Sequence, residues 1–314
     1  MRSALLALGL LFGFTAPGHA ADTLVTILTG PIAGIWYPLG MALSGVYGKA
    51  MKEGSFSAQA TQGSVENLRL LESGDGELGF TLADTLVSAW AGDKAAGFSA
   101  KLVKVRGVAM LYPNYVHLVA SKASGIKTLA DLKGKRVSIG PEQSGSALNA
   151  AAILKAAGVP LGDLATVDHA LFATSARMVE RGEFDAAFST FGLGTEFIRH
   201  LLASGKATLV PIPSEVVAKI GNPAYLPGTI PAGTYDGQPT DVPTAAIMTL
   251  LVTREGVGDD AVYLMTKSLF DHLDQLVGTH PAAKDIDVAK ALSGMPIPLH
   301  PGAAKYYREI GLVK

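Results

Sequence analysis

The chain has 314 residues, of which 48% are hydrophobic, 26 are Lys or Arg and 27 are Asp or Glu, so its formal net charge is −1. A nearly neutral chain is a poor partner for nucleic acid or for an anionic membrane, and we expect neither. The absence of cysteine from the sequence excludes disulfides, thiolate metal sites and thiol nucleophiles. At this length we expect two domains of ordinary size.

Residues 1–20 have the composition of a secretory signal peptide. Arg2 precedes an apolar run from Ala4 to Phe14, and the small residues Gly18 and Ala20 close the segment. The run is too short for a membrane span, and no stop-transfer charges follow it. We therefore expect cleavage after Ala20 and a soluble protein in the periplasm.

From Thr23 to about Thr190 the pattern of strand, turn and helix repeats, which indicates an α/β fold with largely parallel strands. Residues 103–122 are expected to form a strand pair broken at Pro113 and Asn114, and we place a first hinge there. Residues 221–243 are rich in Pro and Gly and predict a long surface loop. The predicted division is lobe 1 at residues 21–112 plus 245–314 and lobe 2 at residues 113–244. Further expected elements are a returning strand over 245–252 and helices over 259–276 and 301–310.

The segment TGPIAGIWYPLG, residues 29–40, joins an expected strand to an expected helix with Pro38 in its first turn. Such a turn directs unpaired backbone N–H groups at one spot and can hold an anion without Lys or Arg. Gly30 and Gly34 would let the backbone make this loop. In the alternative interpretation these two glycines only relieve backbone strain.

Four turns of this kind, rich in Gly, Ser or Thr, stand between strands and helices. In open α/β sheets ligands collect at the carboxyl ends of the strands, so we expect the four turns to face one cleft between the lobes. For Ser144 and Ser146 the alternative is an ordinary helix start. The turns cover residues 30–37, 61–64, 144–146 and 190–194, with Ser64, Ser144, Gly145, Ser146 and Thr190 as candidate ligand contacts.

Three aromatic residues near these turns have two interpretations. Trp36, Tyr37 and Tyr112 could fill the core between the lobes, or they could form a wall against the carbon chain of a ligand. We favour the wall for Tyr37 and Tyr112.

Catalytic and metal-binding patterns are missing from the sequence. It has no Gly-x-Ser-x-Gly elbow, no His-Glu-x-x-His, no Gly-x-Gly-x-x-Gly and no phosphate loop. An exported hydrolase would need a Ser or Asp beside a base, and the scattered histidines supply none. We therefore expect no enzyme activity, no metal and no cofactor.

Seven stretches that together cover almost the whole chain beyond the signal resemble the TAXI family of TRAP transporter solute-binding proteins. They are TGPIAGIWYPLG, GSVENLRLLESG, LYPNYVHLVA, SGIKTLADLKGKRVSIGPEQSGS, DAAFSTFG, IPAGTYDGQPTDVPTAAIMTLLVTRE and PIPLHPGAAKYYREIG. The resemblance implies a type II periplasmic binding-protein fold: two lobes with mainly parallel sheets, joined by two hinge crossovers. It also implies delivery of a captured solute to a TRAP-type membrane permease.

The site residues that the resemblance implies carry over only in part. The Ser-Val-Glu-Asn motif matches at residues 64–67, which adds Asn67, whereas Gln-Ser-Asp retains only Asp84. In the second lobe Trp-Thr-Gly-Gly becomes STFG at residues 189–192, which adds Phe191 and Gly192 as candidates. The first loop keeps Thr29, Gly30, Gly34, Tyr37 and Pro38 but departs from the family pattern at residues 31, 32, 35 and 36, and these departures remove hydroxyl donors.

Because the departures make the predicted site less polar, we expect a small carboxylate solute with a larger apolar part than glutamate, bound by a monomer. A second hypothesis is a ligand sensor of the same fold that docks on a membrane signalling protein.

Overall fold

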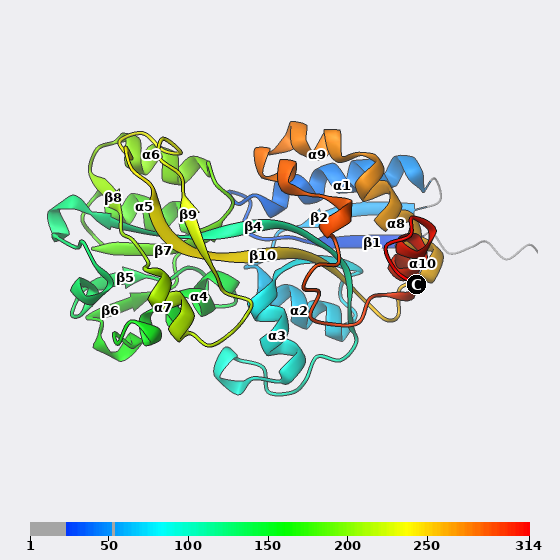
Figure 1. Ribbon diagram of the computed structural model, residues 1–314, viewed down its shortest axis with the longest axis horizontal. Coiled ribbons are helices and arrows are strands. Elements are labelled where there is room, and N and C mark those ends of the chain that lie inside the picture. The colour runs from blue at the N-terminus through cyan, green and yellow to red at the C-terminus, as the bar shows by residue number, and fades with distance from the viewer. Residues whose placement is uncertain (1–22, 52–53) are drawn as a thin grey trace, which may run out of the picture.

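The computed structural model describes residues 23–51 and 54–314 (Figure 1). The predicted signal peptide lies outside the described residues. The strands are β1 (Thr23–Leu28), β2 (Gly54–Gln59), β3 (Leu78–Leu82), β4 (Val105–Ser121), β5 (Arg136–Ser138), β6 (Thr166–Asp168), β7 (Ala186–Phe191), β8 (Ala207–Leu209), β9 (Leu226–Ile230) and β10 (Val242–Arg254). The α-helices are α1 (Trp36–Ala50), α2 (Ser64–Ser73), α3 (Ala83–Ala91), α4 (Gly145–Ala156), α5 (Phe172–Glu180), α6 (Glu196–Ala203), α7 (Ser214–Lys219), α8 (Asp259–Asp271), α9 (Leu273–Thr279) and α10 (Pro301–Glu309).

The strands form one sheet in the order β2-β1-β3-β10-β4-β7-β5-β6, with β8 beside β4 and β9 beside β10. We call the right-hand part of Figure 1 lobe 1, with β1–β3, α1–α3 and α8–α10, and the left-hand part lobe 2, with β5–β9 and α4–α7. Pairing is parallel between β1 and its neighbours β2 and β3, and between β5 and its neighbours β6 and β7. The boundaries at residues 112 and 244 stay a prediction.

The two long strands β4 and β10 run antiparallel through both lobes. The expected break at Pro113 is wrong, because β4 is one continuous strand of 17 residues. The sheet tolerates Pro113, which has no N–H to donate, next to a register shift between Met248 and Leu250 of β10. Asn114 Nδ2 donates to Thr249 Oγ1 at 2.9 Å and ties the two strands together at this point.

Two other expectations needed correction. Residues 221–243 are not all loop, because β9 pairs with β10 from Val242–Ile230 to Ala246–Leu226. The helix expected over 259–276 is split into α8 and α9 at His272, whose φ and ψ of −128° and 32° are not helical. The C-terminal helix is confirmed as α10, with Pro301 in its first turn.

Apolar side chains cover both faces of the sheet. One buried cluster in lobe 1 includes Leu39, Leu43 and Tyr47 of α1 and Tyr307 of α10. A second, larger cluster continues from α2 and α3 under β4 and β10 to α4. Among the described residues, no helix is both long and apolar enough to cross a membrane.

Candidate ligand-binding site

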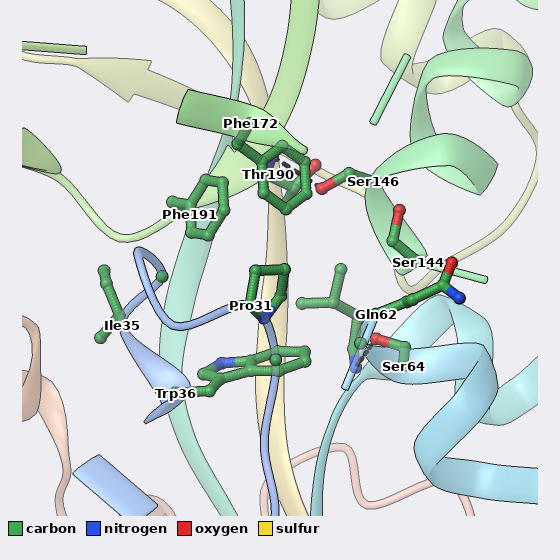
Figure 2. A pocket seen from close by; sticks show the side chains of 15 residues that line it. Pro31, Ile35, Trp36, Gln62, Ser64, Ser144, Ser146, Phe172, Thr190 and Phe191 are labelled. Carbon is green, nitrogen blue, oxygen red and sulfur yellow. Dashed lines mark hydrogen bonds between the residues drawn. The ribbon is translucent and has the colours of Figure 1, made fainter. Parts of the chain in front are cut away.

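A cavity lies between the lobes where the carboxyl ends of β1, β3 and β7 meet (Figure 2). Its empty volume, which includes the space open to solvent at its mouth, is about 360 Å³. It is lined by Gly30, Pro31, Gly34, Ile35, Trp36, Gln62, Gly63, Ser64, Leu82, Ser144, Gly145, Ser146, Phe172, Thr190 and Phe191.

Four helices begin at the cavity wall. Trp36 is the first residue of α1, Ser64 of α2, Gly145 of α4 and Phe172 of α5. The N–H groups of a first helical turn have no partner inside their own helix, and they lie at the positive end of the helix dipole. The cavity therefore receives backbone donors from both lobes.

Local sequence explains two of these helix starts. Gly63 precedes α2 with φ of 122°, in a region that residues with a Cβ rarely adopt. Ser144 caps α4 because its hydroxyl accepts from the Ala147 N–H at 3.2 Å. The ordinary helix-start interpretation of Ser144 therefore holds, and the same turn still faces the cavity.

Two serine hydroxyl groups, one from each lobe, line the cavity. Ser64 Oγ accepts from the Leu82 N–H at 3.1 Å, and Ser146 Oγ accepts from the Thr190 N–H at 3.0 Å (Figure 2). Within the described residues neither hydroxyl proton has an acceptor. Ser64 is fully buried and Ser146 is 5% exposed, so a ligand is the natural acceptor for both protons.

The opposite side of the cavity is apolar. Trp36 stacks on Phe80, with ring centroids 5.8 Å apart and planes 15° apart. Phe172 meets Phe191 edge to face at 4.6 Å between ring centroids. None of the described lining residues carries a charged side chain. The geometry suits a small molecule with an acceptor-rich head and a short apolar part.

The comparison with family models assigns the chain. Residues 27–311 match the model of the NMT1-like family. The chain belongs to the NMT1-like family.

Solved structures share the fold of this NMT1-like protein. PhnD1 from Prochlorococcus marinus, in complex with methylphosphonate, has a TM-score of 0.57 over 93% of this chain and 100% of its own, at 11% identity. A binding protein component of an ABC phosphonate transporter from Pseudomonas aeruginosa has a TM-score of 0.53 over 84% of this chain and 80% of its own, at 12% identity. At such identities only the fold is shared. The predicted α/β fold of periplasmic binding proteins is confirmed.

The assignment to the TAXI family is wrong. The family model that matches, over residues 27–311, is the NMT1-like one. The stretches behind the resemblance are mostly strand, glycine turn and helix start. A two-lobed binding protein of either family needs these features, so they do not separate one family from the other.

The structure brings most of the predicted residues of the NMT1-like protein to the cavity. These residues are Gly30, Gly34, Trp36, Ser64, Ser144, Gly145, Ser146, Thr190 and Phe191. Their contact with a ligand stays a prediction. The residues that sequence reasoning missed are Pro31, Ile35, Gln62, Gly63, Leu82 and Phe172. Phe172 could have been found as the first residue of a helix that follows a strand, β6, in lobe 2.

Five predicted residues do not line the cavity. Tyr112 is fully buried in the apolar cluster that also contains residues of α1 and α10, and it is not part of the cavity lining. Tyr37 follows Trp36 on α1, about 100° around the helix, and is directed away. Gly192 is close to the Ile35 and Ala282 side chains, because a Cβ at position 192 would be only 3.0 Å from each of them. It serves packing between the lobes.

Asn67 and Asp84 have structural partners instead. Asn67 Nδ2 donates to the carbonyls of Thr29 at 2.6 Å and Phe80 at 2.8 Å, which holds the ends of β1 and β3. The Asp84 carboxylate accepts from Tyr225 and Asn149 in lobe 2. Burial raises the pKa of Asp84 to about 6.

Proposed function

We propose that this NMT1-like protein is the extracytoplasmic solute-binding component of an ABC importer. Its solute is a small organic anion with a carboxylate, phosphonate or sulfonate head and a short apolar part. The membrane partner is the permease of the importer.

The observation that carries this proposal is the combination of donors in the cavity. Four helix starts and the hydroxyls of Ser64 and Ser146 surround a space whose described lining has no Lys or Arg. Neutral donors and helix dipoles hold oxyanions well, and they leave a cation without acceptors. Trp36, Phe172 and Phe191 would enclose the apolar part of the solute.

The importer assignment is supported by the fold and by the comparisons. PhnD1 was solved with methylphosphonate, and the Pseudomonas aeruginosa protein is a component of an ABC phosphonate transporter. An exported binding protein also agrees with the signal peptide predicted from the sequence.

A thermal-shift screen tests the proposal. The probes are butylphosphonate, butanesulfonate, pentanoate and glutamate, with neutral pentanamide and cationic butylammonium as matched controls. A ligand that binds only the folded protein adds ~2.7 kcal/mol to the free energy of unfolding at one hundred times its Kd. The melting temperature rises as a result. We expect a shift with at least one apolar acid and none with the amide or the ammonium ion.

Calorimetry on serine variants locates the binding. Ser64→Ala and Ser146→Ala each remove one donor to a charged head, so we expect about a tenfold loss of affinity for the acid that scores in the screen. Ser44→Ala is the control, because Ser44 Oγ donates to the Phe56 carbonyl at 2.7 Å outside the cavity. Equal binding of acid and amide would overturn the anion assignment. Tightest binding to glutamate would overturn the proposal that the solute has an apolar part.

A further inference from the structure

A buried hydrogen-bond network joins the two lobes beside the cavity. Asp84 Oδ2, at the start of α3 in lobe 1, accepts from Tyr225 Oη at 2.7 Å and from Asn149 Nδ2 at 2.7 Å. Asn149 Nδ2 also donates to Tyr225 Oη at 3.0 Å. Asp84 is 3% exposed, Asn149 is fully buried and Tyr225 is 8% exposed. The three side chains therefore form a closed triangle of hydrogen bonds.

The same asparagine touches the wall of the ligand cavity. Asn149 Oδ1 accepts from Thr190 Oγ1 at 2.8 Å. Thr190 lines the cavity, and its N–H donates to Ser146 Oγ. One carboxamide therefore bonds to lobe 1 on one side and orients the cavity wall on the other, so a rotation of Asn149 would disturb both.

The triangle exists only when the lobes are closed. Asp84 belongs to lobe 1, whereas Asn149 of α4 and Tyr225, just before β9, belong to lobe 2. A separation of about 1 Å would take both bonds to Asp84 beyond hydrogen-bond length. A groove with an empty volume of about 1300 Å³ borders Asp84 and Tyr225 on the outside, so water can reach both groups when the lobes part.

A second set of bonds between the lobes lies at the exposed rim. Gln143 accepts from Arg69 Nη1 at 2.8 Å through its side chain and from the Glu66 N–H at 3.3 Å through its carbonyl. Water competes for such exposed groups even when the lobes are closed, whereas it reaches the buried triangle only when the lobes part. The triangle is therefore the stronger contribution to closure.

We propose that Asp84, Asn149 and Tyr225 form an interlobe latch that stabilises the closed form and fixes Thr190 and Ser146 in the cavity wall. We call these three residues the latch. The latch requires lobe motion but no particular ligand, so it goes beyond the proposed function.

Spin labels on the two lobes can measure how the latch affects lobe closure without any ligand. The cysteine-free sequence allows a single labelled pair, Met41→Cys on α1 and Ala203→Cys on α6, which are exposed positions on opposite lobes (Figure 1). Double electron–electron resonance spectroscopy then gives the distance distribution between the two spin labels. We expect a mainly short distance in the parent protein, and a several-fold smaller short-distance population in Tyr225→Phe and in Asp84→Ala.

A matched tyrosine distinguishes loss of the latch from general damage. Tyr235→Phe also removes a buried hydroxyl, but Tyr235 Oη accepts from the Gly194 N–H at 3.1 Å and bonds to His117 Nε2 at 2.8 Å. Gly194 belongs to lobe 2, and His117 lies on the part of β4 that pairs with β7 of lobe 2. We expect its distances to match the parent protein, and circular dichroism checks that every variant is folded. The proposal is overturned if Tyr225→Phe and Asp84→Ala keep the parent distribution, if the parent is already open, or if Tyr235→Phe opens the lobes equally.

Discussion

Gly145 of lobe 2 lies directly against the Ser64 side chain of lobe 1: a Cβ at Gly145 would be 2.8 Å from Ser64 Oγ and 2.8 Å from Leu82 Cδ1. Each residue begins a helix that faces the cavity. The two helix starts can approach this closely because position 145 has no side chain. The cavity therefore depends on a glycine for its closed shape.

Gly145→Ala is predicted to weaken binding of the acid found in the thermal-shift screen at least tenfold. Its Cβ would hold the lobes apart, while alanine fits the first turn of α4 without backbone strain. Calorimetry gives the affinity, and thermal unfolding of the ligand-free protein should change little. Gly162→Ala is the control, since no atom lies within 4 Å of its Cβ position. Binding by Gly145→Ala at the parent affinity would show that the close approach has no role.

Asn67→Ala is predicted to destabilise the protein by ~2–4 kcal/mol, because it removes the side-chain donor to the Phe80 carbonyl and one of the two side-chain donors to the Thr29 carbonyl. Denaturation by guanidinium chloride measures the loss. Asn222→Ala is the comparison, since half-buried Asn222 accepts only the Ala224 N–H within a turn. Equal losses for the two variants would contradict the role given to Asn67.

The free energy of unfolding should decrease as the pH rises from 4 to 6, because of the titration of Asp84. Burial raises the pKa of this carboxyl from 3.8 to about 6, so the folded protein binds the proton more tightly than the unfolded chain does. The contribution is fully present below pH 4 and is lost as the pH rises through about 6. A shift of about two pKa units corresponds to ~3 kcal/mol.

The Asp84→Asn variant separates the pH-dependent contribution of Asp84 from that of the other carboxyl groups. Asp185, for example, has a pKa lowered by its hydrogen bonds to Arg136, and it contributes the opposite slope. The prediction is therefore about the difference between parent and variant in free energy of unfolding, measured by denaturant titrations across this pH range. A difference that does not change with pH would refute it. Tyr225 is the titratable contact of Asp84, and Asp93, Lys155 and Lys219 line the adjoining groove.

Two exposed glycines should respond to alanine in opposite directions. Gly45 lies inside α1 with no atom near its Cβ position, so Gly45→Ala should stabilise by ~0.5–1 kcal/mol. Gly158 has equally open surroundings but a φ of 78°, so Gly158→Ala should destabilise by ~1–2 kcal/mol. Melting temperatures of the two variants test the pair, and shifts of the same sign would contradict the backbone argument.

The sequence was informative where a local pattern determines the structure. Ser64, Gly145 and Ser146 could be predicted because a strand, a small-residue turn and a helix start are all visible within a few residues of each other. The α/β fold followed from the same repetition. Because such turns occur at the carboxyl ends of strands, their convergence on one cavity could be expected from general topology.

Features that depend on distant contacts could not be predicted. Tyr112 is buried in the cluster with α1 and α10 instead of lining the cavity, and its own segment does not reveal these distant contacts. The continuity of β4 through Pro113 depends on its pairing with β10. Asp84 has partners 65 and 141 positions away along the chain. The resemblance therefore suggested a ligand contact for a carboxylate that bonds across the two lobes.

The most direct test of the central claim uses the fluorescence of Trp36, which lies in the cavity wall. The protein is titrated with butylphosphonate, butanesulfonate, pentanoate and neutral pentanamide, and Trp36→Phe identifies the signal from the cavity. The account predicts a saturable change with at least one acid, none with the amide, and loss of the change in the Ser64→Ala, Ser146→Ala double variant. A response to the amide as strong as that to any acid, or an acid response that survives in the double variant, would contradict it.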